Sequence, residues 1–355
     1  MTRLIAFYLP QYHPIPENDQ WWGKGFTEWT NAGKAKPLFR GHYQPNVPAD
    51  LGYYDLRVPE TRLAQALLAR EHGIEAFCYY HYWFAGRRIL ERPLNEVLQS
   101  GQPDFPFCLC WANQTWTGIW HGNPDKVLIE QTYPGIADYE AHFAALLPFF
   151  TDRRYVRVAG KPLFVVYRPN EIPDLDRMLR HWRRMAEQAG LAGLHLVATL
   201  HGKQNWDFRQ HGFDGAVLQC LPPLRRTQYV SWRNPFRKLA RLYQDKSGKP
   251  TVYRYQDVML NMLPDYGADE VYPCLIPNWD NTPRSNRNGL VLQGATPELF
   301  REQLKASLAL VRHRPQENRI VFVKSWNEWG EGNYLEPDLR FGRGYLETIR
   351  QELVA

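Results

Sequence analysis

The chain has 355 residues, a formal net charge of +6 and five cysteines. The length exceeds that of the usual single domain but suits a (β/α)8 barrel with insertions. The basic excess is spread along the chain, so it indicates at most a weak attraction to anionic partners, and we expect no nucleic-acid partner. The cysteines lie in or beside apolar runs without the spacing of a zinc site, which favours buried, reduced thiols.

Aromatic residues make up 14% of the chain, with 13 Trp and 20 Tyr, and many lie in polar stretches rather than in apolar runs. A sugar has apolar C–H faces and polar edges, and flat rings beside hydrogen-bonding groups match both. The composition therefore favours a carbohydrate ligand.

The N-terminus leads directly into a strand and lacks the apolar core and cleavage site of a signal peptide. No apolar run approaches the roughly 18 residues that a membrane span needs. We therefore expect a cytoplasmic protein.

The first predicted strand, Leu4 to Leu9, ends at a segment with three prolines within seven residues, Pro10 to Pro16. Because proline excludes regular backbone hydrogen bonding, the sequence predicts a long irregular loop here. The loop carries Glu28 and Trp29 among several other aromatic residues, and long aromatic loops are usually functional.

The rest of the chain repeats one pattern of apolar strand, aromatic and polar loop, and helix. Further strands are predicted at Ile74–Phe84, Phe107–Trp111, Pro162–Tyr167, Leu194–Leu200, Gly215–Cys220, Tyr272–Ile276 and Arg319–Val323, and helices at Val58–His72, Pro93–Leu98, Ala137–Phe150, Asp174–Ala189 and Pro297–Val311. Eight strands alternating with helices predict an α/β fold of the (β/α)8 TIM-barrel type, with residues 1–355 as one domain. An open, nucleotide-binding sheet would need a glycine-rich turn after the first strand, which is absent.

A basic insertion at about residues 222–260 interrupts this pattern. Its stretch from Leu224 to Pro250 carries eight Lys and Arg residues against one acid, Asp245, with aromatic residues interleaved. Such a segment could contact an anionic membrane face or a lipid-linked glycan with its diphosphate. The alternative is an elaborated strand–helix connection with a solvated basic face.

The strongest candidate for chemistry follows the last strand, where Glu328 and Glu331 stand three residues apart. On a continued strand they would point in opposite directions, but Gly330 and Gly332 can adopt positive φ and turn both carboxylates into one pocket. Two neighbouring acids partly screened from water acquire different pKa values, as glycoside chemistry requires. The alternative is a pair of surface acids, one of them paired with Lys324 or with an arginine.

Residues in the other loops after strands could stack on a sugar or hydrogen-bond its hydroxyl groups, although core packing and loop capping are the alternatives for each. These candidates are Glu28, Trp29, His81, Trp83, Trp111, Asn113, Trp279, Asp280, Asn281, Trp326 and Asn327. The histidines lack metal-ligand spacing, so we expect neither a catalytic metal nor a cofactor.

The block WNEWGEG, which holds both glutamates, resembles the WNEW/FNEW-x-EG block of glycoside hydrolase family 99, the endo-α-mannosidases and endo-α-mannanases. These enzymes are (β/α)8 barrels. The resemblance implies that Glu328 assists the sugar 2-hydroxyl in attacking its own anomeric carbon, through an anhydro-sugar intermediate. It implies that Glu331 is the general acid/base.

A second resemblance covers nearly the whole chain, through the runs YLPQYHPIPEND, WWGKGFTEWTN, FCYYHYWF, FCLCWANQTWT, YPCLIPNWDNTPR and KSWNEWGEGNYLEPD. These are similar to the WbsX-type family of glycosyltransferases of polysaccharide biosynthesis. Members usually read WANENWTRRWDG after the third strand, where this chain has WANQTWTGIWHG. Gln114, Gly118, Ile119 and His121 thus replace an acid, two arginines and an acid, and a charged cluster is nearly neutral.

Together these observations predict a carbohydrate-active enzyme that cleaves or transfers an α-linked glycosyl unit with retention. Its substrate would be an oligosaccharide or polysaccharide in bacterial O-antigen-type or capsule-type metabolism. Two alternatives stay open: a glycosyltransferase that uses an activated sugar donor, and a non-catalytic glycan-binding protein.

Overall fold

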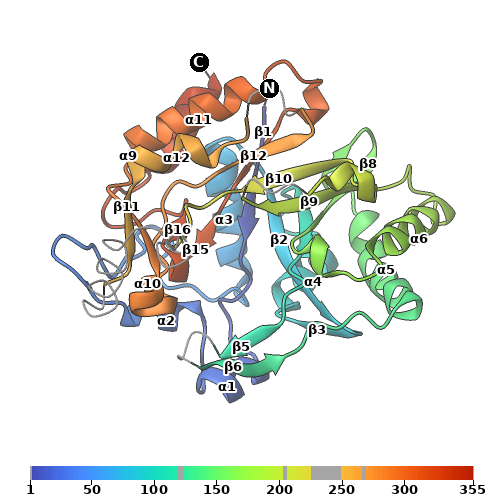
Figure 1. Ribbon diagram of the computed structural model, residues 1–355, viewed down its shortest axis with the longest axis horizontal. Helices are drawn as coiled ribbons and strands as arrows, with labels where there is room; N and C mark the ends of the chain where they lie inside the picture. Colours follow the sequence, from blue (N-terminus) through green and yellow to red (C-terminus); the bar gives the residue numbers. More distant parts are fainter. Residues whose placement is uncertain (1, 119–122, 203–205, 225–248, 266–268, 355) are drawn as a thin grey trace, which may run out of the picture.

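The computed structural model describes residues 2–118, 123–202, 206–224, 249–265 and 269–354 (Figure 1). The central part of the predicted basic insertion, residues 225–248, lies outside the described residues, as do Ile119 and His121. The structure therefore describes only the two ends of the insertion.

Eight parallel strands form a closed barrel, which confirms the predicted fold. They are β1 (Arg3–Tyr8), β2 (Ile74–Phe84), β4 (Phe107–Trp111), β8 (Lys161–Val166), β9 (His195–His201), β10 (Gly215–Gln219), β12 (Val271–Leu275) and β14 (Ile320–Val323). Neighbouring strands pair in the order β1-β14-β12-β10-β9-β8-β4-β2, and β1 pairs with β2 to close the ring. Each is a short apolar run without proline except at β8 and β12, as a strand covered on both faces requires.

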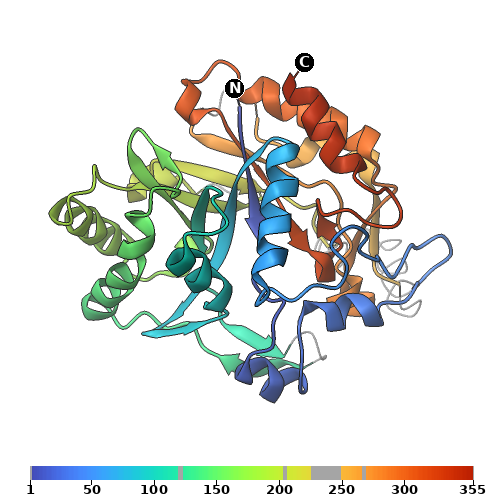
Figure 2. The same ribbon diagram turned by 180° about the vertical axis from the view of Figure 1, so that it is seen from behind.

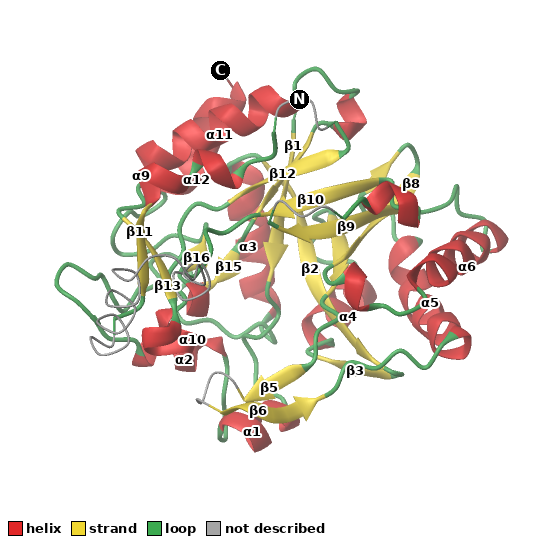
Figure 3. Cartoon of the chain, in the orientation of Figure 1, coloured by secondary structure: helices red, strands yellow, loops and turns green. Residues whose placement is uncertain are grey.

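Helices surround this barrel (Figures 2 and 3). The principal ones are α3 (Pro59–Glu71), α4 (Arg92–Ser100), α5 (Ile136–Phe150), α6 (Leu175–Gln188), α11 (Pro297–Val311) and α12 (Gly344–Val354). Helices α11 and α12 lie side by side near both termini, and α5 and α6 lie together on another side of the barrel. Among the described residues, no helix is long and apolar enough to cross a bilayer.

The N-terminal loop is more regular than its prolines predict, because it contains α1 (Pro16–Trp22) and α2 (Glu28–Lys34). Pro16 occupies the first turn of α1, where the missing N–H costs nothing and the fixed φ suits a helix. The backbone N–H of Glu28 donates to the carbonyl of Gln11 at 2.9 Å. This contact fixes the start of α2 against the loop that leaves β1.

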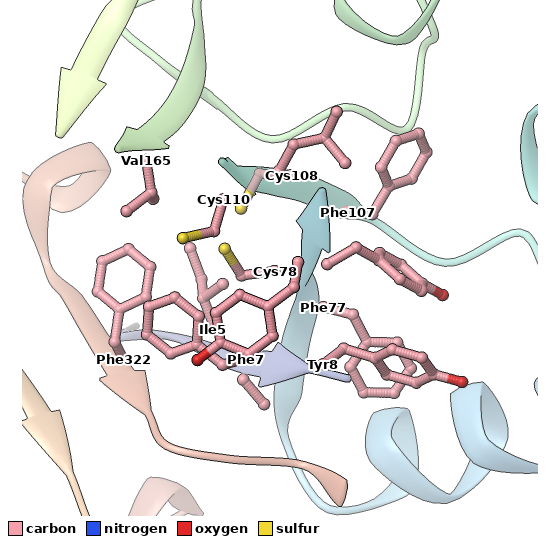
Figure 4. Close-up of a cluster of buried hydrophobic side chains, with 14 of the residues drawn as sticks. Ile5, Phe7, Tyr8, Phe77, Cys78, Phe107, Cys108, Cys110, Val165 and Phe322 are labelled. Atoms are coloured by element: carbon pink, nitrogen blue, oxygen red, sulfur yellow. The ribbon is translucent and has the colours of Figure 1, made fainter. Parts of the chain in front are cut away.

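The strands carry two kinds of buried side chain, as the alternation along a strand requires. Cys78 and Cys110 point to the same side as Phe7 and Phe322, whose ring centroids are 5.5 Å apart, and fill the barrel (Figure 4). Phe77 and its neighbours Tyr8 and Phe107 lie on the other side, towards the helices. Cys78, Cys108, Cys110 and Cys274 are buried thiols, as expected, whereas Cys220 is only partly buried.

Short elements extend the loops of the barrel. They are β3 (Arg87–Ile89), the hairpin of β5 (Trp116–Gly118) and β6 (Asn123–Ile129), β7 (Arg157–Val158), the parallel pair β11 (Thr251–Arg254) and β13 (Leu290–Gln293), α9 (Tyr255–Val258), α10 (Thr282–Ser285) and the antiparallel pair β15 (Asn327–Glu328) and β16 (Asn333–Tyr334). A single 3-10 turn, η7 (Trp329–Glu331), connects β15 to β16. The two predicted catalytic glutamates lie on β15 and η7.

Candidate active site

A pocket of about 300 Å³ opens at the carboxyl ends of the barrel strands, where TIM-barrel enzymes place their active sites. Its aromatic lining consists of Trp22, Tyr80, Tyr82, Trp116 and Tyr167. Its charged lining consists of Arg284, Lys324, Glu328 and Glu331, and its neutral polar lining includes Gln11, Gln114, Thr115 and Thr117. Aromatic faces beside charged and amide groups suit a polyhydroxylated ligand.

Two glycines bring Glu328 and Glu331 to the same pocket, for different reasons. Gly332 has φ +51°, and a Cβ there would lie 2.9 Å from the backbone oxygen of Asp280. Gly330 does not have the positive φ that the sequence predicted. It is needed because a Cβ at this position would lie 1.6 Å from the Glu28 carboxylate. The turn therefore depends on one left-handed backbone position and one close approach.

Lys324 connects the two carboxylates. Its Nζ donates to Glu328 Oε2 at 2.6 Å and lies 3.4 Å from Glu331 Oε2. It also donates to the hydroxyl of Tyr80 at 3.4 Å. Lys324 thus pairs with the glutamates inside the pocket rather than at the surface, and one ammonium group sets both carboxylates within reach of a single sugar ring.

Arg284 supplies a second buried cation. Its Nε donates to Glu28 Oε1 at 2.9 Å, and its NH1 donates to Glu331 Oε1 at 2.7 Å. Glu28 comes from α2, Arg284 from α10 and Glu331 from η7, three segments that pack against one another (Figure 1). The side chain of Glu28 is fully buried, so this ion pair is shielded from solvent.

The surroundings separate the proton affinities of the two pocket acids. Burial and the neighbouring Glu331 raise the pKa of Glu328 to about 7, against the opposing effect of Lys324 and Arg284. Burial also raises the pKa of Glu331, but Lys324 and Arg284 outweigh it and hold this pKa below its usual value. In the ligand-free pocket Glu328 therefore titrates near neutral pH and is protonated below about pH 7, while Glu331 stays ionised.

Three predicted site residues on β2 and β4 do not line the pocket. The rings of His81 and Trp83 lie against His142 of α5, and His81 Nε2 is 2.9 Å from His142 Nε2. The Trp111 ring also packs edge-on against His142. All three point outwards to the helix layer, whereas Tyr80 and Tyr82, one position removed on β2, face the pocket.

Four other predicted residues support the loops beneath the pocket. Trp29 Nε1 donates to the carbonyl of Tyr54 at 2.7 Å. Asn327 Oδ1 accepts from the backbone N–H of Leu9 at 2.8 Å, and Asn113 Oδ1 accepts from that of Arg168 at 2.7 Å. Trp326 is fully buried against Phe77. Together with Glu28, these side chains fix the loops that carry the pocket lining.

The predicted group Trp279, Asp280 and Asn281 follows β12. The Trp279 ring centroid lies 5.4 Å from Lys324 Nζ. Asp280 accepts from Gln44 Nε2 and pairs with His42 Nε2, both at 2.6 Å, and lines a neighbouring cavity instead. Asn281 Oδ1 accepts from the backbone N–H of Leu290 at 2.7 Å.

Several site residues were not predicted from the sequence. Gln11 is 1% exposed and lines the pocket, and its Nε2 has no hydrogen-bond partner among the described residues, so it can donate to a ligand. Glu336 is buried, and its carboxylate accepts hydrogen bonds from the side chains of Tyr54, Gln65 and Trp329. Burial raises the pKa of Glu336 to about 7. Two features of the sequence could have indicated the lining residues. One is the alternation of side chains along β2, and the other is the Pro283-Arg284-Ser285 segment that contains Arg284.

Gln114 marks the place where this chain departs from the usual family run. With its amide oxygen turned towards Arg168, Gln114 accepts from Arg168 Nε at 2.9 Å and from NH2 at 3.1 Å. The amide orientation follows from this hydrogen-bond arrangement. A neutral amide leaves the Arg168 charge less compensated than a carboxylate would, so the rim beside Tyr167 is more cationic.

The described residues contain no group of three or more His, Cys, Asp or Glu placed to hold a metal ion.

A closed parallel barrel with a pocket at the carboxyl ends of its strands defines a (β/α)8 protein. The chain itself belongs to the glycosyltransferase WbsX family, whose sequence pattern matches residues 4–349. It is 41% identical to the uncharacterised protein WxcX of Xanthomonas campestris pv. campestris over 356 aligned positions. The alignment covers 99% of this chain and 49% of WxcX, so the chain spans about half the length of that relative.

Two solved structures share the fold. A glycoside hydrolase-like protein superposes with a TM-score of 0.60 at 14% identity, over 99% of this chain and 93% of the other. The GH99 endo-α-mannosidase from Bacteroides thetaiotaomicron superposes with a TM-score of 0.56 at 12% identity, over 99% and 96%. The family to which the chain belongs indicates a carbohydrate-active enzyme, and these superpositions show a shared fold.

Proposed function

We propose that this protein cleaves or transfers an α-linked glycosyl unit with retention, acting on an oligosaccharide or polysaccharide of bacterial surface-glycan metabolism. The observation that carries the proposal is the pair Glu328 and Glu331 in one aromatic pocket, with a shared ammonium and one proton between them. A retaining reaction through the sugar 2-hydroxyl needs one ionised carboxylate, to accept the proton of the hydroxyl, and one protonated carboxyl group, to protonate the leaving oxygen.

In the proposed reaction, Glu328 takes the proton of the 2-hydroxyl, whose oxygen then attacks the anomeric carbon. Glu331 gives a proton to the leaving oxygen as the glycosidic bond breaks. Glu331 next takes a proton from water or an acceptor hydroxyl, whose oxygen attacks the anomeric carbon and breaks its bond to the 2-oxygen, and Glu328 returns its proton to that 2-oxygen. The anhydro-sugar thus opens with net retention. These roles follow the family-99 resemblance, and they use the single proton that the pair holds.

Because the free pocket holds its proton on Glu328, these roles require that proton to pass to Glu331 before the bond breaks. Lys324 contacts both carboxylates, so its ammonium can follow the negative charge from one to the other. The opposite assignment, with Glu328 as the acid, would need no transfer. The two assignments predict different results for substrates with a good leaving group, because only the variant that lacks the general acid should keep its activity on them.

A product-release screen should begin with α-mannan oligosaccharides, because a solved neighbour of this fold is an endo-α-mannosidase. We expect Glu331→Gln and Glu328→Gln each to lower turnover by at least about 100-fold, the scale of general acid–base catalysis, without unfolding the chain. Glu140→Gln changes a half-exposed acid on α5 and serves as the matched control. Near-wild-type turnover in either site variant would refute the pair.

Aryl glycosides with a good leaving group then assign the roles. Loss of the general acid reduces the turnover of such substrates least, because their leaving group needs little protonation. Glu331→Gln should therefore retain much of its activity on them, while Glu328→Gln should not. The reverse pattern would make Glu328 the acid and reject the roles that the resemblance implies.

A glycosyltransferase with an activated donor is the second candidate. Arg284 and Lys324 place two cations in the pocket, and a donor phosphate would be recognised by such groups. Calorimetric binding of a sugar nucleotide, together with no release of product from α-linked glycans, would favour this function. A lipid-linked glycan acceptor would fit the same candidate.

Glycan binding without turnover would identify a non-catalytic binding protein, provided that the binding survives the double substitution Glu328→Gln/Glu331→Gln. The screen therefore separates all three functions.

A further inference from the structure

A second cavity, of about 190 Å³, lies beside the candidate active site and has no role in the proposed reaction. Four segments enclose it: the loop at residues 41–46, the turn after β12, the end of β13 with the residues that follow, and the stretch from Gly332 to Tyr345. Its lining combines aromatic rings with polar groups. Such a lining is typical of a ligand site rather than of a packing defect, which would be apolar.

The two acids of this cavity are already satisfied by the protein. Asp280 accepts from Thr282, Gln44 and His42. Asp338 Oδ1 accepts from the backbone N–H groups of Arg340 and Phe341, at 2.9 and 2.6 Å, and its Oδ2 accepts from the Tyr334 hydroxyl at 2.8 Å. Neither carboxylate is therefore left to bind a ligand cation.

Two buried donors of the same cavity have no partner. Trp279 is 6% exposed and Tyr345 is 4% exposed. Neither the Trp279 indole N–H nor the Tyr345 hydroxyl has a hydrogen-bond partner among the described residues. A buried polar group without a partner costs about 1–3 kcal/mol, so a ligand that brought an acceptor to either donor would recover part of this energy.

A cation completes the donor set at the mouth of the cavity. The exposed guanidinium of Arg340 lies 4.6 Å from the ring centroid of Tyr43 and 4.7 Å from that of Phe341. The two rings hold the guanidinium in place without neutralising its charge. The groups left for a ligand are thus an indole N–H, a hydroxyl and a guanidinium.

We propose that this second cavity binds the anionic group of an acidic sugar, a carboxylate or a phosphate, with Arg340, Trp279 and Tyr345 as its donors. An oxyanion accepts several hydrogen bonds at once, and arginine pairs with it in a planar, two-pronged geometry. The neighbouring rings of Tyr43 and Phe341 suit the apolar face of the sugar that carries the anion. The binding itself does not depend on catalysis, whereas its role in selecting substrates rests on the proposed function.

The second cavity adjoins the loop that carries Glu331. The backbone N–H of Asp280 donates to the carbonyl of Glu331 at 2.7 Å, and Gly332 packs directly against Asp280. Trp279 lines the second cavity and also lies over the Lys324 ammonium. An acidic residue of a glycan bound here would therefore sit next to the reactive pocket and select substrates that carry such a group.

The Trp279 indole provides a direct probe in the full chain. In protein labelled with ¹⁵N-tryptophan, its N–H signal is assigned by its loss in Trp279→Phe. We expect this signal to shift on addition of glucuronic acid or glucose 6-phosphate, and not on addition of glucose. The two acidic probes decide between a carboxylate and a phosphate ligand.

Substitutions then locate the bound anion. Arg340→Gln should weaken the binding of the acidic probe by about tenfold, and Tyr345→Phe by several-fold, as loss of one charged and one neutral hydrogen bond predicts. Arg343→Gln, three residues away and paired with Asp50, should leave it unchanged. A shift of equal size with glucose would overturn the proposal. So would a shift that survives Arg340→Gln but is lost in Gln11→Ala, because the probe would then occupy the first pocket.

Discussion

At the scale of single residues, the candidate site is a balanced set of buried charges. Arg284 and Lys324 are the cations, Glu28 and Glu331 the anions, and Glu328 is left as the acid that keeps its proton. A fifth charge in this enclosed cluster would be uncompensated, and burial penalises such a charge heavily. The balance depends most on Arg284, since it contacts both Glu28 and Glu331, whereas Lys324 contacts only one of these two anions, Glu331.

Arg284→Gln should therefore change both stability and proton affinity. Removing one partner of a buried ion pair costs about 3–5 kcal/mol, because Glu28 and Glu331 are left without it. The pKa of Glu331, now held below its usual value by Lys324 and Arg284 against burial, should rise. Since a depressed carboxylate pKa stabilises the fold above the unfolded pKa, the variant should lose stability chiefly at neutral pH.

The measurement is a ¹³C-carboxyl titration, with the Glu331 signal assigned by Glu331→Gln. Arg284→Lys is the matched control, because it keeps the charge but loses the fork that reaches two acids. It should leave the Glu331 pKa nearly where it is and still cost stability. If the Glu331 pKa were unchanged in Arg284→Gln, Lys324 alone would be sufficient to keep Glu331 ionised.

At the scale of elements, the eight strands were predictable because each is an apolar run bounded by polar loops. Helices α1 and α2 were not predictable, since a run of prolines predicts irregular backbone, whereas Pro16 occupies the first turn of a helix, where proline is tolerated. The glutamate pair was also predictable, from glycines at a strand end. The residues that line the pocket were not predictable. A sequence shows that side chains alternate between the two faces of β2, but it does not show which face points into the barrel.

The two faces of β2 give a test of this distinction. Tyr82 lines the pocket, whereas Trp83 lies parallel to His142 at 4.7 Å and donates to Asp138 at 3.1 Å. Trp83→Phe should lower stability by about 1–3 kcal/mol and leave glycan affinity unchanged. Tyr82→Phe should change stability by less than about 0.5 kcal/mol and weaken glycan binding about three- to tenfold, as loss of one hydrogen bond predicts.

Urea unfolding and calorimetric titration of the same two variants provide both readouts. If Trp83→Phe weakened binding more than Tyr82→Phe, the outward face of β2 would have to reach the ligand, contrary to the packing of Trp83 on α5.

At the scale of the whole molecule, the barrel encloses many titratable groups in forms that differ from those of the unfolded chain. Burial lowers the pKa of His13, His195 and His201 to about 4 and that of His81 to about 3, and it holds the pKa of His142 well below its usual value. Burial raises the pKa of Glu336 to about 7, and burial with the neighbouring Glu331 raises that of Glu328 to about 7. The histidines and these two acids oppose each other as pH falls.

The histidines should prevail, so the fold should lose stability on acidification from about pH 6.5 to pH 4. In this range the unfolded chain protonates its histidines near pH 6.5 while the buried ones stay neutral, which favours unfolding. Glu328 and Glu336 act the other way, because between pH 4.5 and pH 7 they keep protons that the unfolded chain releases. Five histidines outnumber two acids, and each net proton is worth about 1.4 kcal/mol per pH unit. Urea midpoints at pH 7, 6 and 5 should therefore decrease in that order, and less steeply in His13→Gln; a midpoint at pH 5 equal to that at pH 7 would mean that the buried acids govern the balance.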